Sequence, residues 1–396
     1  MQKKDYKTKI LLFALCAILL FFFSNDFGLI DIEKTAIITA VAIDMEEDEY
    51  SVTAQIAVSE NSTSKTENAK TQITGKGKTV GSAIKNIGDV SGWFPKMSFC
   101  NLIIVGKDLA KDNVITVLDY FSKTFRVQDS ALVALSESKA KDLLTTETPL
   151  DNLSSFALQK IILKNPGFDS DVASVDIKTF CMKYYAPTSS AYMPLVKKNE
   201  QKDADPKEQG GGNNSGGTKT KGKTIFDASN TALFKDGKLV GQLTTEQTHC
   251  LNFFFDNVKN TTIEIPEVSV NGKAPVNYLL TVFNARPKIE LTANEYGVNC
   301  EIGVRLYCKI SDENSTSSDI TFAENAPLPE ELILKAQTLI SNRLLDLIEI
   351  SKETNCDFLM LNEKLYRFNH KYYDKYKDNL LSTTNFSVYA NVQGQK

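Results

Sequence analysis

Near its N-terminus the chain has an unbroken apolar run, which limits where the rest of the chain can fold. Residues Ile10 to Phe23 read ILLFALCAILLFFF and follow four lysines within the first nine positions. As a helix this run would be ~21 Å long at 1.5 Å per residue, against a hydrocarbon core of ~30 Å. A basic start and a short apolar segment are the layout of a secretory signal. This layout predicts that the remaining chain lies outside the cytoplasmic membrane.

The residues around this run decide whether it is removed, lipidated or kept. Its exit, Phe21 to Asp26, offers no small-residue cleavage site of the A-x-A kind. Cys16 follows Leu15 and has seven more apolar residues behind it, so we do not expect it to carry a lipid. We therefore expect an uncleaved anchor with its basic end inside, aided by bilayer thinning or by Leu29 and Ile30. A buried core helix is the alternative, because runs of this length also occur in soluble proteins.

Composition excludes one class of partner and bounds the architecture. The chain has 396 residues and a formal charge of -4, with no cluster of Lys and Arg outside the N-terminus and a polar insert. Binding to nucleic acid requires such a cluster, so we expect no nucleic-acid partner. The length predicts two or three domains. Seven cysteines without a CxxC pair are expected to be free thiols.

After the signal or anchor at 1–24, residues 25–145 are predicted to form an N-terminal α+β module. Apolar runs at Thr35 to Ile43 and Tyr50 to Val58 flank an acidic turn and predict a hairpin. Alternating helix and strand patterns follow at 80–90, 99–105, 114–121 and 131–135. A hairpin completed by helical crossovers indicates a mixed sheet.

A middle module is predicted over residues 146–286, with helices at 150–162 and 175–184. An insert at 197–223 has six glycines and no aliphatic or aromatic side chain beyond Ala204, which predicts a flexible, disordered linker. Beyond it, Asp236-Gly237 between two apolar runs predicts a tight hairpin. Thr244 to Gln247 then predicts a capping box that opens a helix.

A C-terminal α+β module is predicted over residues 287–396. It contains strands at 288–292 and 298–310, a long helix from Pro329 to Lys352, and a closing strand at 386–392. Cys300 and Cys308 share one face of a strand but lie ~26 Å apart, too far for a disulfide. The predicted fold class is thus α+β, with an N-terminal anchor or signal followed by three mixed-sheet modules and a flexible linker.

No motif indicates catalysis. The two histidines, His249 and His370, are far apart in sequence, and we interpret both as partly exposed structural residues. Gly75 to Lys78 lacks the spacing of a phosphate loop and is interpreted as a strand-to-helix turn. The acidic Glu46 to Glu49 segment is interpreted as a solvated turn. We therefore assign no catalytic, cofactor-binding or metal-ligating residues and expect no cofactor.

Two aromatic segments stay open between a structural and a binding role. Trp93-Phe94-Pro95 is either packed behind a helix end or a small partner-binding knob. The run Lys371 to Lys377, KYYDKYK, is either a solvated helix face or an aromatic interface patch.

Several segments, taken together, resemble one family. They are AIITAVAID after Ile32-Glu33, then YSVTAQI, GKGKTVGSAI, LIIVGKDLA, TALFKDGKLVGQLTTEQT and NCDFLMLNEKLYRFNHKYYDKYKD. In this order, from Asp26 to Val392, they resemble the C subunit of spore germinant receptors, the Ger(x)C germination lipoproteins. Family members usually carry a lipidated Cys where this chain has Asp26. The resemblance therefore implies that no lipid is attached there, which favours retention of the apolar run.

The resemblance implies a non-enzymatic subunit of a nutrient germinant receptor. It would be held by residues 10–23 at the inner spore membrane or cytoplasmic membrane, with its ectodomain on the outer face. Its implied partners are a membrane-embedded A subunit and a transporter-like B subunit, and its implied role is assembly and signalling at the start of germination. Binding of a small-molecule germinant is left open. The alternatives are an extracytoplasmic solute- or peptide-binding protein and an exported wall hydrolase.

Overall fold

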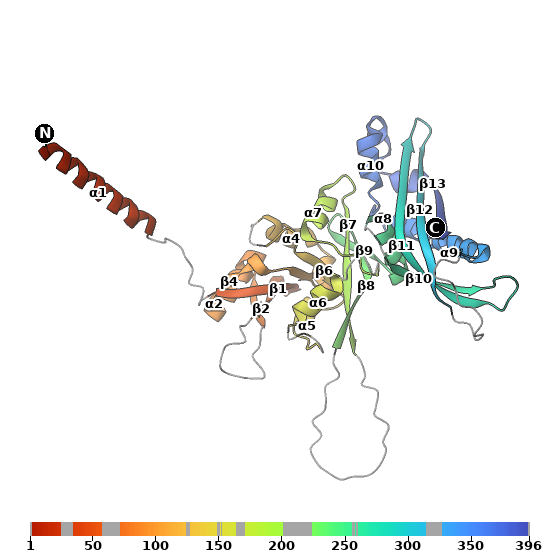
Figure 1. The fold of residues 1–396 in the computed structure, drawn as a ribbon, viewed down its shortest axis with the longest axis horizontal. Helices are drawn as coiled ribbons and strands as arrows, with labels where there is room; N and C mark the ends of the chain where they lie inside the picture. The colour runs from red at the N-terminus through yellow and green to blue at the C-terminus, as the bar shows by residue number, and fades with distance from the viewer. Residues whose placement is uncertain are drawn as a thin grey trace, which may run out of the picture.

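The computed structural model describes residues 2–24, 35–57, 72–123, 127–148, 151, 153–163, 171–200, 224–255, 258, 260–313 and 327–394. Helix α1, Gln2–Ser24, lies apart from the two β-sheets that form the body (Figure 1). Every side chain from Lys9 to Leu20 is exposed, so the helix is not buried in the core. Within the described residues, no helix combines the length and the hydrophobicity needed to cross a membrane.

The first sheet is mixed and has nine strands in the described part of the chain. Eight lie in the order β3-β2-β1-β5-β6-β7-β8-β9, and β4 also pairs with β1. The pairs β1–β4, β1–β5, β5–β6 and β6–β7 are parallel, and the others are antiparallel. The strands are β1 (Thr35–Glu46), β2 (Glu49–Ala57), β3 (Gln72–Gly77), β4 (Phe94–Lys96), β5 (Leu102–Val105), β6 (Leu132–Ser136), β7 (Ser190–Glu200), β8 (Thr224–Lys235) and β9 (Lys238–Leu243).

Helices cover both faces of this sheet because its central strands present apolar side chains on both sides. On β1, Val41 belongs to the apolar cluster under α2, α4 and α7, whereas Ala42 belongs to the cluster under α5 and α6. Strand β5 repeats the alternation with Ile103 and Ile104. The helices are α2 (Val80–Ser91), the 3₁₀ turn η2 (Met97–Phe99), α3 (Lys107–Ala110), α4 (Val114–Lys123), α5 (Ala140–Leu144), α6 (Ser154–Ile162) and α7 (Ile177–Tyr185).

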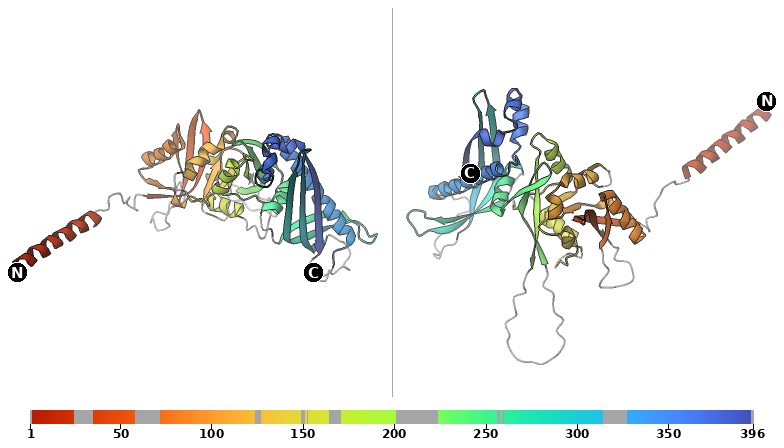
Figure 2. Two further views of the ribbon diagram at one scale, coloured as in Figure 1. Left: turned by 90° about the horizontal axis from the view of Figure 1, so that it is seen from above. Right: turned by 180° about the vertical axis from the view of Figure 1, so that it is seen from behind.

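The second sheet, also mixed, has the order β10-β11-β12-β13 among the described residues, with β12 and β13 parallel. Its strands are β10 (Thr261–Val268), β11 (Val276–Ala293), β12 (Val298–Glu313) and β13 (Thr384–Gly394). Helix α9 (Glu330–Glu353) packs on this sheet, and α8 (Thr245–Phe255) contacts both β8 and β11 (Figures 1 and 2). Shorter elements follow α9: α10 (Leu361–Phe368), η3 (His370–Tyr372), α11 (Tyr373–Tyr376) and α12 (Leu380–Thr383).

The two mixed sheets confirm the α+β class. Both predicted hairpins are present as the pairs β1–β2 and β8–β9. The capping box is present too, since the Thr244 N–H donates to Gln247 Oε1 at 2.9 Å and the Gln247 N–H donates to Thr244 Oγ1 at 3.4 Å. All seven cysteines are free, and six of them are buried.

The structure differs from the expectation at strand β7. Residues 197–200, expected in the linker, continue β7 and pair with β8, while 201–223 lie outside the described residues. The expected boundary between 145 and 146 falls within the part of the chain that builds the first sheet, and the one between 286 and 287 falls inside β11. Pro287 fits there because the pairing with β10 ends at Val282, which leaves that side of β11 as an edge.

Candidate functional site

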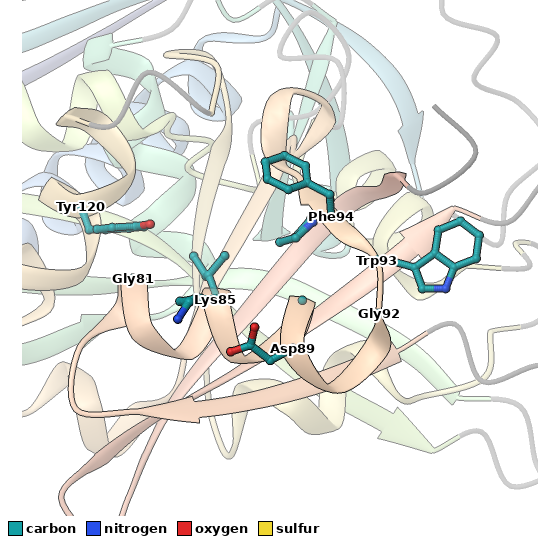
Figure 3. Close-up of a pocket in the computed structure, with 10 residues that line it drawn as sticks. Gly81, Lys85, Asp89, Gly92, Trp93, Phe94 and Tyr120 are labelled. Carbon is teal, nitrogen blue, oxygen red and sulfur yellow. The ribbon is translucent and has the colours of Figure 1, made fainter. Parts of the chain in front are cut away.

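A groove of about 750 Å³ runs along helix α2 on the outside of the first sheet (Figure 3). Gly81 and Gly88 line it, seven residues apart and so on one face of the helix. Tyr120 of α4 lies near Gly81 at one end, and Trp93 lies beyond the helix at the other (Figure 3). The charged residues Lys85 and Asp89 lie between these ends. The groove thus combines two glycines on one face of the helix, an aromatic residue at each end and charges of both signs.

The sequence of α2 explains why Trp93 projects outward. The helix begins with a capping box between Thr79 and Ser82. It ends at Gly92, whose φ of 73° is left-handed and whose N–H donates to Gly88 O at 2.8 Å. The chain turns away at this point, and Trp93 is 48% exposed. Trp93 is therefore not packed behind the helix end, which was one of its two predicted roles.

The glycines of the Gly75 to Lys78 motif serve packing. Strand β3 ends at Gly77 and α2 begins at Val80, which confirms the predicted strand-to-helix turn. A Cβ atom added at Gly75 would overlap the carbonyl oxygen of Ala83, so glycine lets α2 lie directly on β3.

The lysines of that motif pair with the acidic turn. Lys76 Nζ lies 3.0 Å from Glu46 Oε2, and Lys78 Nζ lies 3.5 Å from Glu49 Oε1. Lys139 Nζ lies 2.9 Å from Glu46 Oε1. The hydrogen bonds from Lys139 and Lys76 lower the pKa of Glu46 to about 2. The acidic turn is therefore not simply solvated, and these lysines are engaged within the chain.

His249 and Cys250 are neighbours in α8 with separate surroundings. His249 is buried, contrary to the expectation of partial exposure, with Nε2 3.2 Å from Thr261 Oγ1 and Nδ1 4.0 Å from Asp171 Oδ1. Burial raises the pKa of the Cys250 thiol to about 12, so the thiol stays protonated. His370 is exposed, with its ring 5.0 Å from that of Tyr366. No group of three metal-ligating side chains occurs in the part of the chain that the structure describes.

A second cavity, of about 220 Å³, lies where the segment after α9 meets the first sheet. Asp357 is buried in its wall and accepts the backbone N–H groups of Leu361 at 2.8 Å and Asn362 at 2.7 Å. Burial raises the pKa of Asp357 to about 7, although these two hydrogen bonds and the charge of Lys235 act to lower it. Lys235 and Lys377 also line the cavity, where Lys235 Nζ donates to Thr188 O and Lys377 Nζ to Asp374 Oδ1, each at 2.8 Å. A small polar molecule in the cavity would meet these ammonium groups and the carboxyl group of Asp357.

The aromatic run Lys371 to Lys377 is attached to the rest of the chain mainly through Tyr376 and Lys375, while Lys371, Asp374 and Lys375 are exposed. Tyr376 is buried, and its hydroxyl donates to Asn294 O at 2.8 Å. Lys375 Nζ donates to Glu295 O at 2.7 Å. The run therefore holds the turn between β11 and β12.

The sequence did not single out Gly81, Gly88 or Asp357. Two glycines seven residues apart in a helical pattern are a signal that would have located the groove. Asp357 offers no such signal, because its burial depends on contacts with strands far away in the sequence.

The family models decide the relationship of this chain to known proteins. Residues 29–198 match "Spore germination protein N-terminal domain", and residues 229–394 match "Spore germination B3/ GerAC like, C-terminal". The chain belongs to the Ger(x)C family of germinant-receptor C subunits. Membership in Ger(x)C implies association with other receptor subunits and with a membrane.

The chain is also similar to a solved structure, "Crystal Structure of the GerBC protein". The alignment covers 91% of this Ger(x)C chain and 99% of the other, with 15% identity and a TM-score of 0.46. With so low a TM-score, the family assignment rests on the two family models. Comparison with curated proteins gives no match.

Proposed function

We propose that this Ger(x)C chain is a non-enzymatic assembly subunit of a nutrient germinant receptor, tethered by residues 10–23 with its body on the outer face of the inner spore membrane. A membrane-embedded A subunit and a transporter-like B subunit assemble on its surface. Nutrient detection by the assembly then starts germination.

The exposed apolar surface of α1 carries this proposal. Eight large apolar side chains between Ile10 and Leu20 are 47–77% exposed. Leaving such surface in water costs about 25 cal/mol per Å². A helix that is apolar all round needs a nonpolar medium or a partner around it. This requirement supports a membrane tether.

The non-enzymatic part is supported by what the candidate nucleophiles and bases do. Desolvation raises the pKa of the thiols of Cys100, Cys300, Cys308 and Cys356 to about 12, so they are protonated near neutral pH. His249 is engaged with a hydroxyl group inside the core. These groups pack the two sheets.

Deletion of the gene tests the role. We expect spores that no longer respond to the nutrient but still germinate when the receptor is bypassed. Complementation with a chain that lacks residues 2–24 should not restore the response. An unchanged nutrient response after deletion would contradict the receptor role, and a full response with the truncated chain would contradict the need for the tether.

A second candidate function, binding of a small polar solute, is favoured by the cavity at Asp357. Its lysines and carboxyl group would suit a ligand that carries both signs of charge. Calorimetry of the full chain in detergent with candidate nutrients tests this, with Lys235→Met as the variant expected to lose the heat. Absence of heat with every nutrient would exclude it.

A further inference from the structure

Exposed apolar side chains lie around the start of strand β1, on both faces of the sheet, since Ile37 points to the opposite face from Ile38, which packs in the cluster under α2. They are Ile37, Val90, Trp93, Phe94 and Phe99, each 37–67% exposed, and we call them the α2–β4 patch. The two chain segments that carry them are held together because β4 pairs with the first residues of β1, with Thr35 opposite Phe94. An apolar patch held by regular strand pairing is a feature of the folded body and marks a surface that another apolar phase covers.

The patch lies where the chain enters the body from helix α1. Ten residues, 25–34, separate Ser24 at the end of α1 from Thr35 at the start of β1. A segment of this length spans at most ~40 Å. Because Thr35 pairs with Phe94, a bilayer that holds α1 is within reach of the patch.

The residue types of the patch match a membrane–water interface. Tryptophan concentrates at the level of the lipid headgroups, with lysines nearby. Lys96 Nζ lies 5.9 Å from the ring centroid of Phe99, and Lys85 lines the groove that ends at Trp93 (Figure 3). Aromatic and basic side chains together at one end of the sheet are a combination found in the headgroup region.

We propose that the α2–β4 patch rests in the interface of the same bilayer that holds α1, with Trp93 among the lipid headgroups. This inference rests on the proposed tether. Lipid is favoured over a protein partner because the strand that carries Ile37 and pairs with β4 begins ten residues after α1, a helix that itself requires a nonpolar medium. The body is then held at the membrane at two points and lies against it in one orientation.

Trp93 is the one tryptophan of the chain, so its fluorescence reports on the patch without labelling. The full chain is reconstituted in vesicles of phosphatidylcholine and phosphatidylglycerol, with and without bromine on the acyl chains. We expect the emission of Trp93 to be blue-shifted relative to that of a tryptophan in water. We also expect Trp93 to be protected from soluble acrylamide and to be quenched by the brominated lipid.

Two variants that move the tryptophan supply the controls. W93F/Y296W places it at Tyr296, which is 97% exposed in the β11–β12 turn, and it should stay accessible to acrylamide. W93F/L20W places it in α1 and should be quenched by the brominated lipid. A third variant, F94E/F99E, keeps Trp93 and should lose the lipid quenching, while its circular dichroism is unchanged because both side chains are on the surface.

The outcomes separate the two proposals. If the L20W reporter is quenched and Trp93 is not, the patch does not touch lipid although the tether stands. If the L20W reporter is not quenched either, the tether itself fails. If Trp93 is shielded only after other receptor subunits are added to the vesicles, the patch contacts protein, and the proposal of a lipid contact is overturned.

Discussion

Asp357 and Ser190 join parts of the chain that are 167 residues apart: the backbone N–H of Asp357 donates to the Ser190 hydroxyl at 3.0 Å. Beside this bond, the thiol of Cys356 donates to the carbonyl oxygen of Phe234 at 3.3 Å. These two bonds attach the segment after α9 to strands β7 and β8 of the first sheet.

Asp357 should make stability depend on pH. Burial raises its pKa from 3.8 to about 7, so between these values the folded chain holds a proton that the unfolded chain has released. Stability from this group is therefore present at low pH and is lost as the pH rises toward 7. Asp357→Asn removes this titration. We expect the unfolding free energy of the wild type, relative to the variant, to fall by up to ~1.4 kcal/mol per pH unit in this range.

Denaturant titrations at stepped pH measure this difference between Asp357→Asn and the wild type. A difference that stays constant across the range would contradict a raised pKa at Asp357.

Glu46→Gln should lower the stability of the chain at neutral pH, and this loss should disappear at low pH. The lysines lower the pKa of Glu46 from 4.5 to about 2, so its contribution is present above 4.5 and is lost as the pH falls toward 2. We expect a loss of ~0.5–1 kcal/mol at neutral pH, because the carboxylate is partly exposed and salt-bridged on both sides. Glu47→Gln is the matched control in the same turn and should change stability little. Equal effects of the two variants would show that Glu46 gains nothing from Lys76 and Lys139.

Gly106→Ala should destabilise the first sheet. A Cβ atom there would overlap Asp44 Oδ1, which accepts the N–H of Ala140 at 2.8 Å. Because Asp44 is buried, displacing its carboxylate should cost ~1–3 kcal/mol. Gly297→Ala is the control, since a Cβ atom there meets nothing within 4 Å. Thermal melts measure the stability of both variants. A Gly106→Ala chain as stable as the Gly297→Ala chain would contradict the predicted clash with Asp44.

The native chain in detergent should react with an apolar, membrane-permeant thiol reagent at Cys16 only, because Cys16 is on the surface of α1, in the segment that the detergent covers. The other six cysteines are buried, and unfolding should expose all seven to labelling. Mass spectrometry after labelling measures this, and Cys16→Ser should leave the native chain unlabelled. Labelling of a second thiol under native conditions would show that one of the apolar clusters opens.

We propose that the chain carries no lipid at Asp26 and keeps its apolar run. The intact mass of chain extracted from membranes should equal that of the full sequence. A diacylglycerol adduct on Cys16, or a chain that starts near Ser24, would contradict retention of the apolar run.

Local features of this fold were predictable from sequence, and distant ones were not. The Asp236-Gly237 turn and the apolar face of α9 depend on neighbours a few residues away. Strand β7 was missed because Pro194 interrupts its pattern and its polar end is ordered only by pairing with β8. The cavity at Asp357 was missed because its walls come from residues far apart in sequence, such as Thr188, Lys235 and Tyr373.

One apolar cluster includes Ile84 of α2 at one end of the body and Leu344 of α9 at the other, with Leu251 of α8 between them. Close-packed interiors of this kind deform little under load. We therefore expect the body to move as one rigid unit. A force applied at the β11–β12 turn would tilt the whole body about the end that carries α1. A subunit built in this way would pass on the movement of one partner to another by changing its angle to the membrane, with its internal shape preserved.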